Sequence, residues 1–353
     1  MERNIFKILA VLAAALLVVS LLPIFGNTPQ NQKPPQKNPE KVLMWREVIP
    51  AAPFAPRDSH ASFIFQNKIF LIGGINGNGL VDAKRFIPYW QAPHFNDIWF
   101  SEDGERWNKA ESENIWPPRR SMSTVLFREK LWMMGGWSPA TGYSRDLWQS
   151  EDGVNWTKVD IKLPWEPREG QSVEVFDGKI WLLGGVNYDR RKVFNDVWYS
   201  QDGLDWKEAN STALWAGRWD HALALHDGKF FLAGGMDLKN KVYSDVWSSP
   251  DGEHWSLLTD APGWEARQGH SAFSFDGKLW IMGRLNDDKI NPGPNDVWSS
   301  PDGIVWKKEG DLPWDGREDF TAVILNDKIY VIGGMGNDWT WRNDVWEAEL
   351  KMR

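Results

Sequence analysis

The chain has 353 residues, a length that allows one large domain or two ordinary ones. Its formal net charge of −8 argues against binding to nucleic acid, because contacts with phosphates need a basic face. The absence of Cys excludes disulfides, thiolate metal sites, a Cys nucleophile and a lipid-modified N-terminal Cys.

Residues 1–26 are expected to be a targeting segment. Residues 8–25 are uncharged and almost wholly apolar, and as a helix they would span roughly 27 Å, just enough for a bilayer core. Arg3 and Lys7 precede this run, which predicts a cytoplasmic N-terminus and an exported remainder. The length of the run favours an uncleaved membrane anchor, and a cleaved signal peptide that leaves a secreted protein is the alternative.

Residues 27–41 are rich in Pro, Gln, Asn and Lys and cannot bury an apolar face. They are predicted to form a disordered linker between the membrane and the rest of the chain. The rest is therefore expected to be extracytoplasmic, in a periplasm or at a cell surface.

A pattern of about 50 residues recurs six times in residues 42–350. An Asp-Val-Trp motif or a variant marks each copy, with steps of 49, 50, 49, 51 and 48 residues between successive Trp. The six are Trp99, Trp148, Trp198, Trp247, Trp298 and Trp346. An Arg stands 17 residues before the second residue of a Gly-Gly pair in each copy, except that Arg284 replaces that second Gly in one copy. Paired glycines and spaced aromatic residues at this period are typical of a β-propeller, in which each repeat supplies one blade.

Each repeat is predicted to contain four short strands, a to d, with an Asp-Gly turn between strands c and d. The sixth copy ends after strand c. Trp45 lies 12 residues before Arg57, just as the strand d residue Trp107 lies 12 residues before Arg119. The N-terminal strand is therefore expected to complete the last blade and close the ring, which removes exposed sheet edges. The predicted fold is all-β, a monomeric six-bladed β-propeller over residues 42–350, preceded by one N-terminal hydrophobic helix.

These features resemble the Kelch-repeat propellers of the galactose-oxidase-like superfamily, in their bacterial-type six-repeat form. The resemblance rests on the repeat Arg, the apolar run that ends in Gly-Gly, and the spaced aromatic residues, and it covers essentially everything after residue 41. It implies the fold and leaves the activity open, because propellers of this kind include enzymes and interaction scaffolds. Galactose oxidase uses copper with a Cys-Tyr crosslink, which a chain without Cys cannot form, so no cofactor is expected.

Positions repeated in every copy are expected to serve the fold, and positions that break the repeat are candidates for a ligand site. The repeat Arg is expected to be buried, stacked on Trp and bonded to carbonyls. Five Trp break the repeat, and all map to the face formed by the b–c and d–a loops: Trp90, Trp137, Trp219, Trp339 and Trp341. The first repeat also has one long b–c loop, residues 75–95, and long loops are often functional.

The same face is rich in charged residues. Carboxylates directly follow the repeat Arg in several copies, and Arg120 and Arg284 are the unusual cations. The residues expected to bind a ligand beside the five Trp are Arg120, Arg284, Asp220, Glu318 and Asp319. Aromatic rings beside acids suit a sugar or a protein partner, whereas the alternative is that the loop Trp only cover the rim.

The expected function is non-catalytic recognition of a glycan or protein ligand through this face. No metal is expected, although His60, His221 and His270 share one repeat position, because their three blades are not symmetric about the axis. The resemblance to exported sialic acid mutarotases, six-bladed Kelch propellers that use an acid and an arginine, implies a sugar-processing enzyme as the alternative. Its candidate catalytic residues would be Glu169, Asp220, Glu318 and Arg120. A structural subunit of a surface complex is the third possibility.

Overall fold

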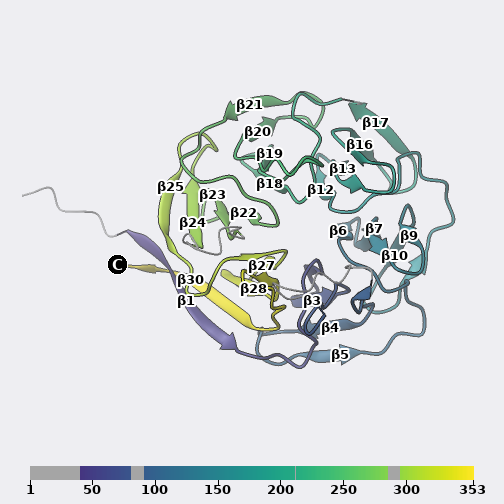
Figure 1. Cartoon of the computed structure of the whole chain (residues 1–353), viewed down its shortest axis with the longest axis horizontal. Coiled ribbons are helices and arrows are strands. Elements are labelled where there is room, and N and C mark those ends of the chain that lie inside the picture. Colours follow the sequence, from purple (N-terminus) through teal and green to yellow (C-terminus); the bar gives the residue numbers. More distant parts are fainter. Residues whose placement is uncertain (1–39, 81–90, 211, 285–294) are drawn as a thin grey trace, which may run out of the picture. The chain divides into compact units, whose positions relative to one another are not determined.

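Six four-stranded antiparallel sheets surround a central axis in the computed structural model (Figure 1). The structure describes residues 40–80, 91–210, 212–284 and 295–353. Residues 41–353 form one unit, and the expected N-terminal helix and nearly all of the linker lie outside the described residues. No helix within the described part of the chain is long and apolar enough to cross a membrane.

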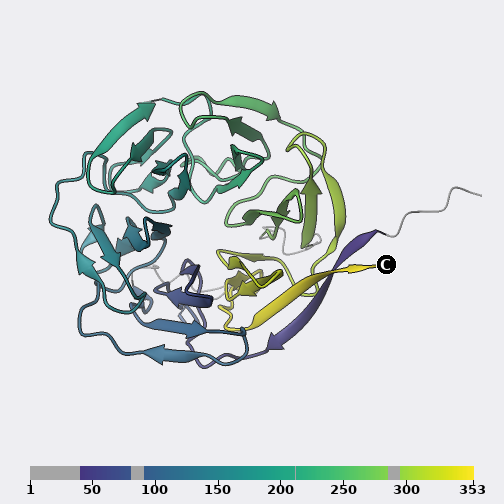
Figure 2. The same cartoon turned by 180° about the vertical axis from the view of Figure 1, so that it is seen from behind.

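The blades follow one another in chain order around the axis (Figures 1 and 2). Blade 1 contains β2 (Ala61–Phe65), β3 (Lys68–Ile72), β4 (Ile98–Ser101) and β5 (Asn108–Ala110). Blade 2 contains β6 (Ser123–Phe127), β7 (Lys130–Met134), β10 (Leu147–Ser150) and β11 (Thr157–Lys158). Blade 3 contains β12 (Ser172–Phe176), β13 (Lys179–Leu183), β16 (Val197–Ser200) and β17 (Trp206–Asn210).

Blade 4 contains β18 (Ala222–His226), β19 (Lys229–Ala233), β20 (Val246–Ser249) and β21 (Ser256–Thr259). Blade 5 contains β22 (Ser271–Phe275), β23 (Lys278–Met282), β24 (Asp296–Ser300) and β25 (Lys307–Asp311). Blade 6 contains β27 (Thr321–Leu325), β28 (Lys328–Ile332), β30 (Val345–Met352) and β1 (Lys41–Ile49). Three short ladders pair β8 (Trp137–Ser138) with β9 (Gly142–Tyr143), β14 (Val186–Asn187) with β15 (Lys192–Val193), and β26 (Arg317–Glu318) with β29 (Met335–Gly336).

The N-terminal strand closes the ring, as the spacing of Trp45 predicts. β1 pairs antiparallel with β30, from Lys41 opposite Met352 to Glu47 opposite Trp346. Trp45 meets Trp314 edge to face with ring centroids 5.0 Å apart. In blade 1, Trp107 makes the same edge-to-face contact with Phe54 at 5.1 Å, and Phe54, like Trp314, lies three residues before the repeat Arg of its blade. Trp45 is therefore the strand d Trp of blade 6.

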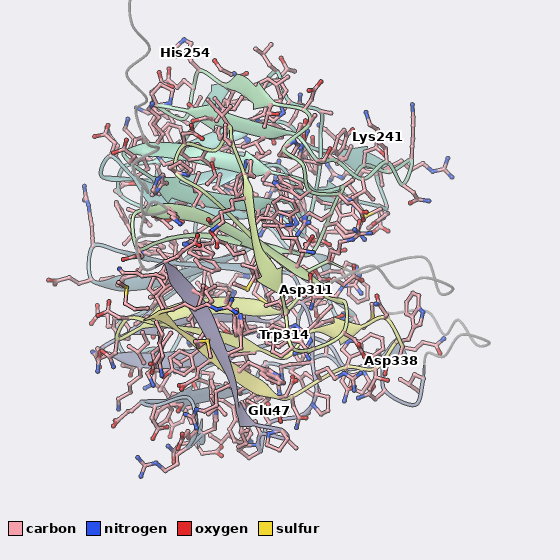
Figure 3. The ribbon with its side chains drawn as sticks, turned by 90° about the vertical axis from the view of Figure 1, so that its left-hand side faces the viewer. Glu47, Lys241, His254, Asp311, Trp314 and Asp338 are labelled. Atoms are coloured by element: carbon pink, nitrogen blue, oxygen red, sulfur yellow. The ribbon has the colours of Figure 1, made fainter. Side chains whose placement is uncertain are left out.

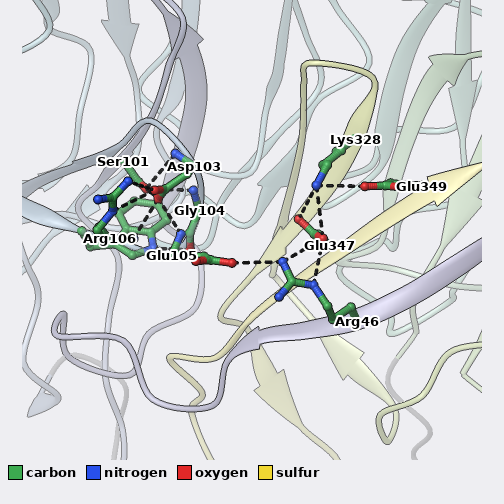
Figure 4. Close-up of polar contacts among 10 residues, drawn as sticks. Arg46, Ser101, Asp103, Gly104, Glu105, Arg106, Lys328, Glu347 and Glu349 are labelled. Atoms are coloured by element: carbon green, nitrogen blue, oxygen red, sulfur yellow. Dashed lines mark hydrogen bonds and ion pairs between the residues drawn. The ribbon is translucent and has the colours of Figure 1, made fainter.

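Charged side chains extend this closure to blade 1 (Figure 4). Arg46 on β1 bonds Glu347 within blade 6 at 3.0 Å and Glu105 in the c–d hairpin of blade 1, also at 3.0 Å. Lys328 lies against Glu347 and Glu349 on the same sheet. The last blade is thus held to the first by side chains as well as by the strand.

The contacts within each Ser-x-Asp-Gly-x-x-Trp hairpin explain why these residue types recur. In blade 3, the Ser200 hydroxyl accepts the N–H groups of Asp202 and Gly203, and the Trp206 indole donates to the Gly203 carbonyl at 3.1 Å. Gly203 has φ of 82°, and a Cβ there would lie 2.6 Å from the ring of Trp132 in blade 2. Each hairpin therefore packs its backbone directly on an aromatic ring of the preceding blade, which only Gly permits.

The repeat Arg is buried in every blade, and its main partner is the Asp of the Asp-Val-Trp motif. In blade 3, Arg168 donates to both oxygens of Asp196 at 2.6 and 2.9 Å and to the Gly184 carbonyl at 2.9 Å. The carbonyl contact is as expected, but in this blade the guanidinium stacks on Phe194. The expected contact with a Trp ring is present in blades 5 and 6, at Trp264 and Trp314. These contacts join the d–a loop, the Gly-Gly pair and strand c of one blade, so the repeat Arg belongs to the scaffold.

Candidate functional site

The axis is crossed by a closed ring of backbone hydrogen bonds. The residue two positions after each repeat Arg has φ between 50° and 63°, and its N–H donates to the carbonyl of its counterpart in the preceding blade at 2.7 to 3.3 Å. The six residues are Ser59, Ser121, Gly170, Asp220, Gly269 and Asp319. Gly, Asp and Ser are tolerated in this left-handed conformation, where bulky or β-branched side chains are strained.

A cavity of about 420 Å³ lies against this ring, on the side of the b–c loops. Lys241 and Asp338, in the b–c loops of blades 4 and 6, lie on this face, whereas His254 in a c–d hairpin lies on the opposite face (Figure 3). The residue directly after the repeat Arg reaches the cavity in all six blades: Asp58, Arg120, Glu169, Trp219, Gln268 and Glu318. We call this cavity the axial pocket, and Tyr188, Asn240 and Trp339 from b–c loops complete much of its wall.

Backbone pairing with the segment after Gly-Gly orients the residue that follows the repeat Arg toward the pocket. In four blades it forms an isolated antiparallel bridge with the residue that follows Gly-Gly, as Asp58 does with Ile75 and Trp219 with Met236. In blade 6 the same pairing forms the ladder of β26 and β29. The second Gly of the pair allows this approach, because a Cβ at Gly74 would lie 2.6 Å from the Asp58 carbonyl oxygen.

One ion pair spans the pocket wall between blades 2 and 3. Arg120 bonds the Glu169 carboxylate through Nε at 3.0 Å and Nη2 at 3.3 Å, and Glu169 is only 3% exposed. Burial opposes the charge of Arg120, but the nearby Glu169 and Asp58 carboxylates raise the pKa of its guanidinium above the usual value. The guanidinium also lies 5.2 Å from the centre of the Trp137 ring.

Three further carboxyl groups in the pocket lining belong to Asp58, Asp220 and Asp319. Burial raises the pKa of Asp58 and Asp220 well above the usual value, and the charge of Asp319 raises both further. Burial also raises the pKa of Asp319, to about 6, although the Ser59 hydroxyl donates to its Oδ2 at 3.2 Å. These carboxyl groups therefore hold their protons to a higher pH than isolated carboxyl groups do.

Most residues predicted to bind a ligand meet at this pocket. Its lining includes six of the predicted residues: Trp219, Trp339, Arg120, Asp220, Glu318 and Asp319. It also includes Glu169, which together with Arg120, Asp220 and Glu318 makes up the four catalytic candidates.

The other predicted ligand-binding residues lie elsewhere. Trp137 is not part of the pocket lining; its ring lies against the guanidinium of Arg120 and packs on His94, with 5.2 Å between the ring centres. Trp341 is 1% exposed, packs on Met335, and bonds the Asn78 side chain through its backbone. Arg284 pairs with Glu265 instead of lining the pocket, and Trp90 lies outside the described residues.

Tyr188, Gln268 and Asn240 also line the pocket, although they are not among the predicted residues. Gln268 could have been found, because it directly follows a repeat Arg like the predicted residues Arg120 and Glu318. Tyr188 and Asn240 lie in b–c loops that differ in length and sequence between copies, so no repeat position marks them.

The three His with a shared repeat position lie beside a separate cavity of about 160 Å³ that also borders the axial ring. Burial lowers the pKa of His60 and His221 to about 3 and that of His270 well below its usual value, so all three are neutral. Each packs against the first Gly of the preceding blade's pair, as His221 does at Gly184. No group of three or more His, Asp or Glu within the described ranges is arranged to hold a metal ion.

Comparisons with known proteins agree with this architecture. A family model described as the KLHDC2/KLHL20/DRC7 Kelch-repeats domain matches residues 59–284, and a Kelch motif model matches residues 316–347. A solved structure titled "Structure of YjhT" aligns with a TM-score of 0.65 and 16% identity over 87% of this chain and 99% of that one, a likeness that shows the fold alone. A search of curated proteins gives no match.

Proposed function

Because the chain belongs to the Kelch-repeat family of β-propellers, we propose that it is a recognition module that binds a ligand in the axial pocket and on the surrounding loops. The observation that carries this proposal is that six side chains of five different kinds, one from the same repeat position of each blade, line one pocket. Packing in a repeated scaffold would favour similar side chains at equivalent positions, whereas an asymmetric ligand requires different ones.

A glycan fits the pocket better than an extended protein surface does. Trp219, Trp339 and Tyr188 supply aromatic rings for the C–H faces of a sugar, and the neighbouring carboxylates accept hydrogen bonds from its hydroxyl groups. A volume of about 420 Å³ lies within the ordinary range for small-molecule sites. A protein ligand that inserts a side chain into the same pocket is the alternative occupant.

The proposal includes tethering of the propeller to a membrane on its extracytoplasmic side. The apolar run of residues 8–25 after Arg3 and Lys7 supports it. Fractionation of cells that express the full chain, beside a chain that starts at residue 40, tests this part. Recovery of the full chain in the soluble fraction, at its full mass, would contradict the anchor.

The binding test is a glycan array probed with the full chain purified in detergent. The Trp219→Ala/Trp339→Ala double variant should lose binding, because both rings line the pocket. The control is Val305→Ala, which changes a 68% exposed side chain in a c–d hairpin on the opposite face. Retention of binding by the double variant would place recognition elsewhere, and no binding of any glycan by the wild-type protein would refute glycan recognition.

A sugar-processing enzyme is the second candidate, favoured by Asp319 and its neighbours. A carboxyl group with a pKa of about 6 can give and accept a proton near neutral pH, and Arg120 stands in the same pocket to stabilise a developing negative charge. The test is the rate at which α and β anomers of a bound reducing sugar exchange, measured by NMR. An enzyme would accelerate the exchange and lose this effect in Asp319→Asn while still binding; a pure binder would leave the rate unchanged.

A further inference from the structure

We propose that the ligand of the axial pocket carries a protonated primary amine, as an amino sugar does. This inference rests on the proposed recognition of a glycan and names the chemical class of that glycan. It is carried by the charge balance of the pocket, by buried polar atoms that lack partners, and by the arrangement of the acidic groups.

Acidic side chains outnumber basic ones in the pocket lining. Five carboxyl groups and one guanidinium line the axial pocket, and that guanidinium, on Arg120, is already bonded to Glu169. None of Asp58, Asp220 and Asp319 forms an ion pair with any residue in the described ranges. The charge of Arg120 lowers the pKa of all three carboxyl groups, but it does not offset the effect of burial. An ammonium group would supply a second positive charge that favours their ionised forms, whereas a neutral sugar would not.

Unpartnered buried atoms point to a ligand with several donors. Asp58 is 3% exposed, and no donor in the described part of the chain meets good hydrogen-bond geometry at its Oδ1, although the Trp341 indole lies near enough to lower the pKa of Asp58. The Gln268 Oε1 is also buried without a partner, and both residues line the pocket. Leaving buried acceptors unpaired is unfavourable, and an ammonium group has three N–H donors with which to satisfy them.

The third unpartnered atom fits the sugar part of the ligand. The indole nitrogen of Trp219, at the same repeat position in blade 4, is buried and has no acceptor among the described residues. A sugar hydroxyl can accept this hydrogen bond. The ring faces of Trp219 and Trp339 favour a cation as well as the C–H faces of a sugar.

The arrangement of the acids favours an organic cation over a metal ion. No three acidic or His side chains in the described ranges converge closely enough to hold a metal. Asp58 and Asp319 come from the adjacent blades 1 and 6, whereas Asp220 comes from blade 4, which adjoins neither of them. A ligand of several atoms with an amine and hydroxyl groups can contact them together.

The same groups predict how binding depends on pH. The titratable and charged side chains that face the site are Asp58, Asp220, Asp319, Glu169, Glu318, Arg120, Tyr188 and, beside Arg120, Tyr143. Both tyrosines stay neutral, because burial raises their pKa values. A cationic ligand favours the ionised carboxylates, so binding should release protons and tighten as the pH rises from 5 to 7, while the amine stays protonated.

The test is isothermal titration calorimetry of the full chain in detergent with three trisaccharides of one linkage: glucosamine, N-acetylglucosamine and glucose. A lysine-containing tripeptide is the fourth probe. The glucosamine trisaccharide should bind tightest, and its affinity should fall with added salt. Asp58→Asn and Asp319→Asn should each weaken it about tenfold or more, because each removes a charge-assisted hydrogen bond. Asp160→Asn, at an exposed position outside the pocket, should leave it unchanged.

The outcomes separate this inference from the function on which it rests. If the acetylated or neutral trisaccharide binds as tightly as the glucosamine form, the amine is not recognised, although glycan recognition stands. If no trisaccharide binds and a full glycan array is also negative, the proposed function itself fails. Binding of the peptide without binding of glucosamine would overturn the assignment to a sugar. Circular dichroism of each Asn variant checks that any loss of affinity is not unfolding.

Discussion

Neutralising Asp319 should stabilise the protein by an amount that grows as the pH rises above the usual pKa of 3.8 and is complete above the folded-state pKa of about 6. Its pKa in the folded chain is about 6, against a usual value of 3.8. Between these values the folded state retains a proton that the unfolded state has released, so the stability of the wild-type protein falls as the pH rises through this window. At pH 8 the ionised group carries the full penalty, and at pH 4 it carries almost none.

The size of the effect follows from the shift. About two pKa units at about 1.4 kcal/mol each give at most about 3 kcal/mol, and water in the pocket reduces this, so about 1 to 3 kcal/mol is expected. Asn suits the site because it tolerates the left-handed backbone, with φ of 53° at Asp319, and its amide oxygen can still accept from Ser59. Asp319→Asn also removes a charge that raises the pKa of Asp58 and Asp220, so it relieves all three groups.

Urea denaturation followed by Trp fluorescence at pH 4.5, 6 and 8 measures this difference. The free energy of unfolding of Asp319→Asn should exceed that of the wild type by the full amount at pH 8 and by only about a third of that amount at pH 4.5. Asp160→Asn, exposed and away from the pocket, should show no such dependence. A variant that is less stable than the wild type at pH 8, or equally changed at both extremes, would refute the argument that Asp319 is held against its preferred ionisation.

Three further changes test the scaffold. Arg168→Met should lower the free energy of unfolding by about 3 to 5 kcal/mol in urea denaturation, because it leaves Asp196 without its buried partner. The control is Arg191→Met at an exposed position, and an equal loss of stability in this control would contradict the prediction. Gly203→Ala should lower the free energy of unfolding by more than about 1 kcal/mol in the same measurement, because the φ of Gly203 is 82° and the new Cβ would meet the ring of Trp132. The control is Gly178→Ala, where a Cβ meets nothing within 4 Å, so this variant should show only the cost of a positive φ. Deletion of residues 1–49 should expose the edge of β30 and cause aggregation in size-exclusion chromatography, and a monomeric, cooperatively folding product would show that β1 is dispensable.

The sequence alone was sufficient to predict the propeller and its closure. The residues at the recurring Arg, Gly-Gly, Asp-Val-Trp and Asp-Gly positions make contacts within one blade or with a neighbouring blade. The same contacts therefore recur in each repeat of the sequence. Even the placement of Trp45 in the last blade followed from counting 12 residues to Arg57. The partner of the repeat Arg was missed, because the motif Asp is 27 to 40 residues away and looks like an ordinary strand residue.

Only the tertiary structure decided which repeat-breaking residues share a pocket. Trp219 and Trp339 line it, whereas Trp341 is buried and Arg284 pairs with Glu265, although all four map to the same face by sequence. Arg120 and Glu169 are 49 positions apart, and Asp319 lies 260 positions from Ser59, to which it is hydrogen-bonded. Closure of the ring brings such residues together at the axis, and the depth and direction of each side chain there depend on how neighbouring blades pack. That packing is not encoded in the spacing of any single repeat.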